Sequence, residues 1–304
     1  MKGNRGFALV VTLIVTTLMV ALLVELIHQV YVDISLSRHF TDGQQASLLA
    51  ESGITGGRKL LVTSLQNREY TSLNDTWAAP VKLDDETGAI EVVITEESGR
   101  ININGLVQPN GEFDARILDS IKRLGARLSL PEELWSALAD WMDTDDLPRS
   151  GGAESSYYRA LNPPYSARNA RLATLSEMSL VKGFTAEYIA ALEPFVTVHA
   201  APYAQVNINT APREVLMALD EGIDERMAGR ILEERRVAPF KALGELSRIP
   251  GGDTIANRLA GKASCRGTLF RIRSIARVRE TARTVETVLR MSGSAPEILM
   301  WQEY

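Results

Sequence analysis

Residues 6–24 read GFALVVTLIVTTLMVALLV, and this stretch decides the architecture of the chain. From Phe7 to Val24 it runs for 18 residues without a charge. A helix rises 1.5 Å per residue, so this run spans about 27 Å, close to the hydrocarbon thickness of a bilayer. It is longer than the apolar core of a cleaved secretory signal, and no small-x-small cleavage site follows it. The stretch is therefore expected to be a transmembrane helix.

The charges on either side of this run predict its orientation. Lys2 and Arg5 precede it, whereas Glu25 and Asp33 follow it. Positive charge is retained on the cytoplasmic side of a membrane, so the N-terminus is expected in the cytoplasm. Nearly all of the mass would then lie outside the cytoplasm.

The composition of the whole chain is that of a globular protein. Its 304 residues are 45% hydrophobic and 23% charged, which excludes a disordered, collagen-like or multi-span membrane protein. The net charge of −5 has the wrong sign for a general nucleic-acid binder. The single cysteine, Cys265, excludes an intrachain disulfide.

Residue patterns after the apolar run predict the order of the remaining elements. Apolar positions from Ile27 to about Gln66 have helical spacing, so the helix is expected to continue and to loosen near Gly43. Strands are predicted at 89–95 and 100–104, joined as a hairpin, and near 270–273 and 284–289. Apolar and polar residues alternate there: Ile101 and Ile103 are expected to be buried with Asn102 and Asn104 solvated, and Phe270 and Ile272 alternate with arginines. Helices are predicted over 113–194 and 210–262. This order indicates an α+β fold whose sheet is interrupted by a helical insertion.

An acidic cluster reads DWMDTDDLPRSGGAE over residues 140–154. Four carboxylates within seven residues repel one another, and only Arg149 is near in sequence to compensate them. Calcium, which takes six to eight oxygen ligands, would turn this repulsion into binding energy. Leu147 and Pro148 stand where an EF-hand needs an oxygen ligand and a glycine, so this is not an EF-hand.

A looser calcium site is nevertheless expected in this cluster. The first-choice ligands are Asp143, Asp145 and Glu154, followed by Asp140 and Asp146. Asn169 is either a further carbonyl donor or a turn residue. The alternative is a solvated acidic loop without a metal, and the neighbouring Trp135 and Trp141 are expected in the core.

A second helical block, residues 206–251, is similar to helix-hairpin-helix repeats, including those of DNA receptors in competence systems. Such a hairpin offers backbone N–H groups to phosphate. Here it reads DEGIDE over 220–225, and its four carboxylates would repel a phosphate. A purely structural helical pair is therefore favoured, with Arg235, Arg236 and Lys241 as the argument for nucleic-acid binding.

Catalysis has little support in the sequence. Cys265 has no histidine near it in sequence, and no Gly-x-Ser-x-Gly, Walker or zinc-ligand spacing occurs. The protein is expected not to be an enzyme, and an anchored hydrolase remains the third-ranked alternative.

The N-terminal stretch RGFALVVTLIVTTLMVALL resembles the prepilins, the precursors of type IV pilins and of type II secretion pseudopilins. In that family a membrane-embedded prepilin peptidase cleaves after the glycine, here between Gly6 and Phe7, and methylates the new N-terminal Phe7. The family usually has Glu at the fifth position after the cut, where this chain has Val11. In lacking this Glu, the chain resembles the K-type minor pseudopilin. The stretch DWMDTDD…GAESSYY resembles the calcium-binding helical domain of that type.

The resemblance implies the following fold and domain division. A long N-terminal transmembrane helix packs on a small antiparallel pilin-like sheet, which is interrupted by a large insertion of the helix-hairpin-helix or SAM-like kind. The expected segments are a leader (1–6), the transmembrane (7–27) and periplasmic (28–66) parts of the helix, a β domain (67–109 and 264–304), a first helical subdomain (110–205) and a helix-hairpin-helix-like subdomain (206–263).

The resemblance also implies a function and a location. The chain would cap or initiate the periplasmic pseudopilus at its tip and be stabilised by calcium. It would cross the inner membrane of a Gram-negative bacterium once, with its bulk in the periplasm. Other minor pseudopilins, prepilin peptidase and the inner membrane are the expected partners, and nucleic acid is not. The alternative is a membrane-anchored, competence-receptor-like DNA-binding protein.

Overall fold

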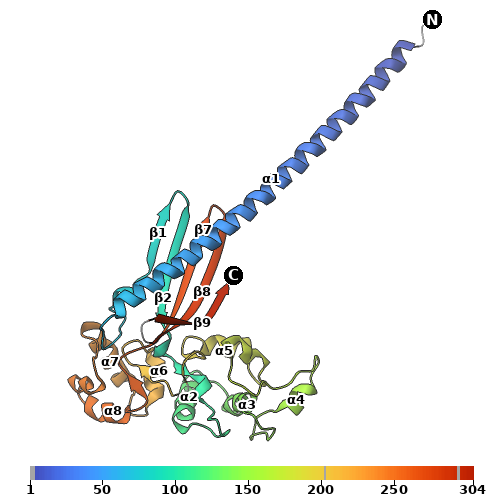
Figure 1. Cartoon of the computed structure of the whole chain (residues 1–304). Helices are drawn as coiled ribbons and strands as arrows, with labels where there is room; N and C mark the ends of the chain where they lie inside the picture. Colours follow the sequence, from blue (N-terminus) through green and yellow to red (C-terminus); the bar gives the residue numbers. More distant parts are fainter. Residues whose placement is uncertain (1–3, 202, 293–294) are drawn as a thin grey trace.

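The computed structural model describes residues 4–201, 203–292 and 295–304. A long helix lies along a five-stranded antiparallel sheet, and a helical domain lies beyond one end of that sheet (Figure 1). The α-helices are α1 (Asn4–Leu65), α2 (Ala115–Arg127), α3 (Glu133–Met142), α4 (Ser155–Arg159), α5 (Ala186–Leu192), α6 (Arg213–Leu219), α7 (Glu225–Val237) and α8 (Gly252–Arg258). The strands are β1 (Val81–Asp85), β2 (Gly88–Glu96), β3 (Ile101–Asn102), β4 (Val196–Thr197), β5 (Val206–Asn207), β6 (Ala263–Ser264), β7 (Leu269–Val278), β8 (Thr281–Ser292) and β9 (Ala295–Glu303). Short 3₁₀ helices are η1 (Thr76–Ala78), η2 (Glu97–Gly99), η3 (Ile103–Gly105), η4 (Leu175–Leu180) and η5 (Leu243–Arg248).

Helix α1 is continuous over 62 residues, which corresponds to about 93 Å. Its N-terminal half projects away from the rest of the chain, and its C-terminal half packs on the sheet (Figure 1). Residues 7–34 are all exposed, whereas Ala46, Ala50 and Leu61 are fully buried. The predicted long helix is confirmed, but it does not loosen near Gly43, because this residue is buried on the packed face of α1.

The main sheet has the strand order β1-β2-β7-β8-β9, with every neighbouring pair antiparallel. In β7, Phe270 and Ile272 are fully buried while Arg273 is exposed, as the alternating pattern predicts. The ring of Trp77, from the segment between α1 and β1, packs edge-on against Phe270 with centroids 5.2 Å apart. Helix α1, this segment and one face of the sheet therefore share a single apolar core.

The predicted hairpin between 89–95 and 100–104 is wrong. Strand β2 pairs with β7, residues 97–99 form the 3₁₀ turn η2, and β3 pairs in parallel with β4. Asn102 and Asn104 are buried rather than solvated, since the Asn104 amide donates to the carbonyls of Leu172 and Val198. An alternating pattern predicts extended backbone but does not identify the partner strand.

The helical insertion between β2 and β7 has a hydrophobic core of its own. Trp135 and Trp141 are buried in it, as predicted. Ile101 and Ile103 also pack in this core rather than under the sheet. The insertion therefore begins near residue 99 and not at 110. It lies at the end of the sheet farthest from the N-terminus of α1 (Figure 1).

Candidate functional site

The exposed half of α1 has the properties of a membrane anchor. Among the described residues, α1 is one helix that is long and apolar enough to cross a bilayer. Its threonine hydroxyls are satisfied within the helix, because Thr12, Thr16 and Thr17 each donate to a carbonyl one turn earlier. This is the arrangement that a hydrocarbon environment requires of polar side chains. Phe7 lies in the first turns of the helix and is 74% exposed.

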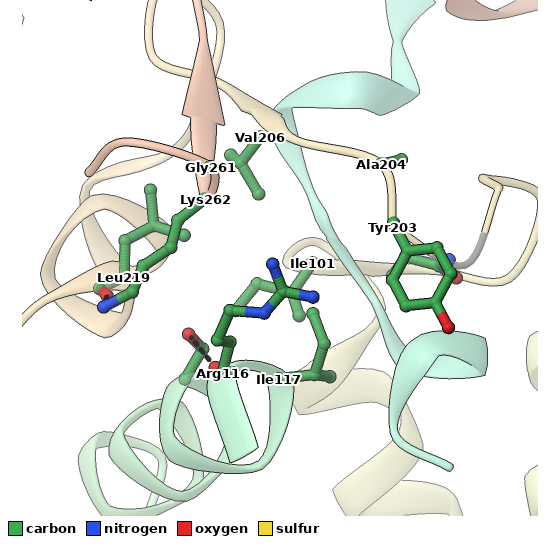
Figure 2. A pocket seen from close by; sticks show the side chains of 11 residues that line it. Ile101, Arg116, Ile117, Tyr203, Ala204, Val206, Leu219, Gly261 and Lys262 are labelled. Atoms are coloured by element: carbon green, nitrogen blue, oxygen red, sulfur yellow. Dashed lines mark hydrogen bonds between the residues drawn. The ribbon is translucent and has the colours of Figure 1, made fainter. Parts of the chain in front are cut away.

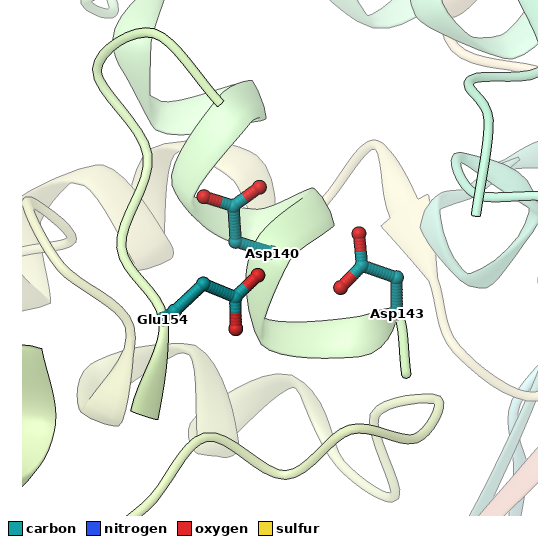
Figure 3. Close-up of side chains that lie close together, drawn as sticks. All are labelled: Asp140, Asp143 and Glu154. Atoms are coloured by element: carbon teal, nitrogen blue, oxygen red, sulfur yellow. The ribbon is translucent and has the colours of Figure 1, made fainter. Parts of the chain in front are cut away.

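Three carboxylates of the predicted acidic cluster meet where α3 ends (Figure 3). Asp140 and Asp143 lie one turn apart and therefore project from one side of the helix end, and Glu154 reaches them from the segment before α4. One oxygen of each lies within 4.8 Å of an oxygen of the other two. All three residues are buried. Burial of like charges this close is unfavourable without a cation.

Arg149 compensates two of these carboxylates. Its Nη1 lies 2.6 Å from Asp140 Oδ1 and also contacts Asp143 Oδ2, and its backbone N–H donates to Asp140 Oδ2 at 3.0 Å. Its Nη2 contacts the carbonyl of Gly111, and its guanidinium lies 4.9 Å from the centre of the Phe113 ring. The guanidinium is thus held between the carboxylates and the segment before α2.

Glu154 has no such compensation. Neither of its carboxylate oxygens has a hydrogen-bond partner among the described residues, and the same is true of Asp143 Oδ1. Burial, together with the negative charges of Asp143 and Asp140, raises the pKa of Glu154 to about 7. A buried carboxylate with both oxygens unpartnered is what a hard cation would bind.

Asn169 adds a neutral oxygen next to this cluster. Its side-chain oxygen is buried without a hydrogen-bond partner in the described part of the chain, and its φ of 51° belongs to a turn. With Asp143, Thr144 and Gly111 it lines a cavity of about 170 Å³. The two readings of Asn169, turn residue and carbonyl donor, are therefore compatible.

The structure brings together three of the five predicted ligands, in a different order of priority. Asp140, a second choice, lies in the cluster, whereas Asp145, a first choice, lies in the exposed loop with Asp146. Asp145 Oδ1 accepts a hydrogen bond from the backbone N–H of Leu147 at 2.8 Å. The spacing alone favoured Asp145, but the turn after α3 directs its side chain into a local turn contact instead.

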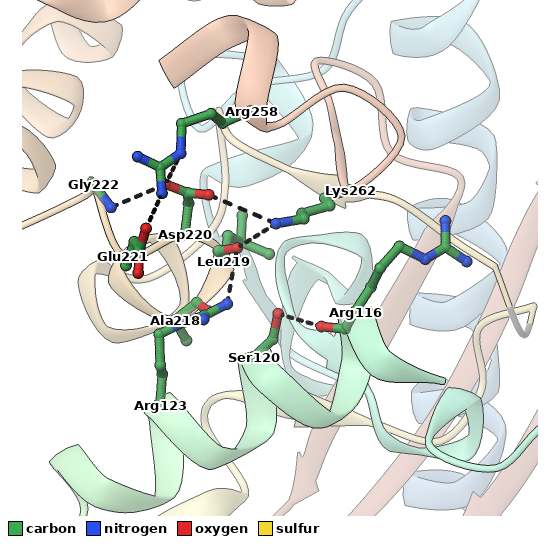
Figure 4. A network of polar contacts seen from close by, with 10 residues as sticks. All are labelled: Arg116, Ser120, Arg123, Ala218, Leu219, Asp220, Glu221, Gly222, Arg258 and Lys262. Atoms are coloured by element: carbon green, nitrogen blue, oxygen red, sulfur yellow. Dashed lines mark hydrogen bonds and ion pairs between the residues drawn. The ribbon is translucent and has the colours of Figure 1, made fainter. Parts of the chain in front are cut away.

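The hairpin between α6 and α7 has its polar groups paired within the chain (Figure 4). Asp220 Oδ1 accepts from the backbone N–H of Gly222 at 2.9 Å and lies 2.8 Å from Arg258 Nε. Glu221 also pairs with Arg258, and Asp224 caps α7 by accepting from the N–H of Met227. A carboxylate of the hairpin itself thus takes the backbone N–H that a phosphate would use.

The basic residues near this hairpin divide into two groups. Arg235 is buried, and its Nη1 donates to the carbonyls of Ile208 and Ala211, so it cannot reach a ligand in this structure. Arg236 and Lys241 are exposed. Of the three basic residues that would favour nucleic-acid binding, only Arg236 and Lys241 are therefore accessible to a ligand.

A small cleft and a buried cysteine lie in the helical insertion. A small cleft lined by Arg116, Ile117, Tyr203 and Lys262, among others, has a volume of about 30 Å³ (Figure 2). That is room for about one water molecule. Burial raises the pKa of Cys265 to about 12, so its thiol is a poor nucleophile.

Comparison with known proteins gives a consistent family. Residues 99–201 and 206–264 match two domains of the family described as type II secretion system (T2SS), protein K. A curated type II secretion system protein K from Pseudomonas aeruginosa is 33% identical over 262 residues, covering 81% of this chain and 77% of the relative. The protein of the same name from Aeromonas hydrophila is 28% identical, and the match covers 93% of this chain and 92% of that relative.

A solved structure agrees with these relatives. A chain in the GspK-GspI-GspJ complex of the enterotoxigenic Escherichia coli type 2 secretion system has a TM-score of 0.78 and 25% identity. The match covers 88% of this chain and 99% of that one. It bears out the predicted fold, in which a long helix packs on an antiparallel sheet interrupted by a helical insertion. On the family matches and the shared fold, this chain belongs to the protein K family of the type II secretion system.

Proposed function

We propose that this chain is a minor pseudopilin that caps or initiates the periplasmic pseudopilus at its tip. One observation carries the tip position: the helical insertion covers the end of α1 and the sheet that lies farthest from the N-terminus (Figure 1). With the helices of neighbouring pseudopilins packed side by side in a filament, the next subunit would need the space that the insertion fills. The chain can therefore end a filament but not lie within it.

Val11 also supports a place at the tip of the pseudopilus. Val11 replaces the Glu that in this family is thought to neutralise the N-terminal amine of a neighbouring subunit. A subunit at the tip has no further subunit above it and does not need that carboxylate. An unpaired carboxylate in the bilayer would cost several kcal/mol. Processing between Gly6 and Phe7 and methylation of Phe7 complete this part of the proposal.

Other minor pseudopilins are the proposed partners, since a chain similar to this one is solved in the GspK-GspI-GspJ complex. Full-length chain in detergent micelles would be mixed with the other minor pseudopilins of the same system and passed over a sizing column. Co-elution as one stoichiometric complex is expected. Separate elution of this chain at about 10 µM of each subunit would contradict the proposal, since stable interfaces bind more tightly than this.

Calcium bound by Asp140, Asp143 and Glu154, with Asn169 as a further oxygen donor, is proposed to stabilise the insertion. The unpartnered oxygens of Glu154 support this site, because they are buried and face two other carboxylates. Outside the cytoplasm even an affinity of about 10⁻⁴ to 10⁻³ M would fill it. The full-length protein is expected to melt at a higher temperature with calcium than with chelator. Equal melting temperatures would contradict the proposed calcium site.

The DNA-receptor alternative has no observation in its favour beyond Arg236 and Lys241. It would be revived by retention of a DNA duplex in a gel at about 150 mM salt, where nonspecific electrostatic binding is weakened.

A further inference from the structure

We propose that Arg149 is an internal counter-cation that occupies the carboxylate cluster in the metal-free chain and is displaced when calcium binds. The inference rests on the proposed calcium site and adds a competitor to it. The side chain would then act as a switch between two arrangements of the loop after α3.

The contacts of Arg149 are the contacts a metal would need. Both oxygens of Asp140 are used by Arg149, Oδ1 by the guanidinium at 2.6 Å and Oδ2 by the backbone N–H at 3.0 Å. One oxygen of Asp143 is used as well. Only Asp143 Oδ1 and the two oxygens of Glu154 stay unpartnered among the carboxylates of the cluster. Calcium takes six to eight oxygens, so these three supply at most half of its ligands, and Asp140 is the adjacent carboxylate that could supply more.

Charge gives a second reason for displacement. A calcium ion lies about 2.3 to 2.6 Å from its oxygen ligands. If it bound Asp140 while the guanidinium remained, the two cations would lie within about 5 Å of each other in a buried site. Their repulsion there would be several-fold stronger than in water. The metal and the guanidinium are therefore alternatives at this carboxylate.

The loop around Arg149 has room for the exchange. Residues 144–148 and Ser150 are exposed, and the Arg149 side chain is itself 20% exposed, so a short path leads from the cluster to solvent. The cluster is closely packed on the other side, because a Cβ on Gly152 would lie 1.9 Å from Asp140 Oδ2. The guanidinium would leave outward, and its contacts with Gly111 and Phe113 would be lost with it.

The proposal predicts opposite effects of one substitution on two measurements. Arg149→Gln removes the competitor, so calcium should bind at least about tenfold more tightly, which corresponds to about 1.4 kcal/mol. The same substitution leaves the carboxylates uncompensated without metal, so the chelator-treated protein should melt at a lower temperature. If Arg149 instead held the carboxylates in position for the metal, both the calcium affinity and the metal-free stability of the Arg149→Gln variant would fall.

The experiment is a calcium titration of the full-length protein in detergent micelles, followed calorimetrically, for wild type, Arg149→Gln and Arg168→Gln. Arg168 pairs with Glu177 nearby on the surface, so its replacement removes the same charge without touching the cluster. Arg149→Lys, which keeps one cation but not the forked contact, should bind with intermediate affinity and serves if Arg149→Gln does not fold.

The expected result is a tighter Arg149→Gln variant and an unchanged Arg168→Gln variant. Equal or weaker calcium binding by both Arg149 variants, beside a wild type that binds, would overturn the switch and leave the metal site standing. Absence of calcium binding by all four proteins would overturn the metal site itself, and the switch with it.

Discussion

Gly53 of α1 lies so close to Ser274 of β7 that a Cβ at position 53 would come within 2.1 Å of Ser274 Oγ. The same Cβ would also lie 3.0 Å from side-chain carbons of Ile90 and Val92. One turn later, a Cβ on Gly57 would lie 2.9 Å from Ile272. Glycines on this face of the helix therefore allow α1 to approach the sheet closely.

Gly53→Ala is expected to destabilise the packing of α1 on the sheet by about 1–3 kcal/mol, because the added methyl group overpacks the contact. Gly56 is the matched control. It is exposed on the same helix, with no atom within 4 Å of an added Cβ, so Gly56→Ala should stabilise the protein by about 0.5–1 kcal/mol. Melting of both variants by circular dichroism measures this, and equal shifts for the two would show that the close approach has no energetic role.

The stability of the protein is expected to depend on pH through Glu96, which lies at the junction between the sheet and the insertion. Its carboxylate accepts hydrogen bonds from Asn207 of β5 and from Thr210, and Asp75 is the charged group that acts on it. Burial raises the pKa of Glu96 to about 7. The folded state thus binds a proton more tightly than the unfolded chain does, so the free energy of unfolding should fall as the pH rises from about 4.5 to 7.

Glu96→Gln should remove this part of the pH dependence. The wild type should lose about 3 kcal/mol of stability between these pH values through Glu96, and the variant should be the more stable protein at pH 8. Urea unfolding at pH 5 and pH 8 measures the difference between the two proteins. A variant less stable than wild type at both values would show that Glu96 is favourably ionised in the folded state.

Glu154→Gln tests the carboxylate cluster through the metal. The amide cannot replace a charged bidentate ligand, so the rise in melting temperature on adding calcium should be lost or much reduced. Without metal the variant should be as stable as wild type or more stable near pH 8, because an unpartnered buried charge has been removed. Asp146→Asn, in the exposed loop, is the control and should keep the full calcium response.

Asp220→Asn tests the structural account of the hairpin. Asp220 is buried and pairs with Arg258, and Lys262 Nζ lies 3.6 Å from its other oxygen. Loss of the charge should cost about 1–3 kcal/mol, measured by urea unfolding. Asp119→Asn, at an exposed position of α2, should change the stability by no more than about 0.5 kcal/mol. If Asp220→Asn stabilised the protein and conferred DNA binding, the hairpin would be a suppressed phosphate site.

The sequence predicted elements well where a regular pattern extended over many residues. The uncharged run from Phe7 to Val24 and the alternation around Phe270 and Ile272 each indicated the observed element. The sequence did not predict strand pairing where the two strands lie far apart along the chain. Nothing in residues 100–104 indicates that β3 pairs with β4, about 95 residues later. Pairing of that kind depends on the packing of the whole insertion.

The carboxylate cluster was only partly predictable for a similar reason. Spacing placed the candidates within one short segment, but the end of α3 at Met142 decides that Asp140 and Asp143 point inward and Asp145 does not. The junction role of Glu96 had no sequence signal, because its partners Asn207 and Thr210 are more than 100 residues away.

Maturation of the chain from a prepilin into a pseudopilin can be read from an intact mass spectrum of the mature protein. The chain would be purified from the membrane of a cell that contains its prepilin peptidase. We expect loss of residues 1–6 and one added methyl group on Phe7. An unprocessed N-terminus, or cleavage at any other bond, would contradict this maturation.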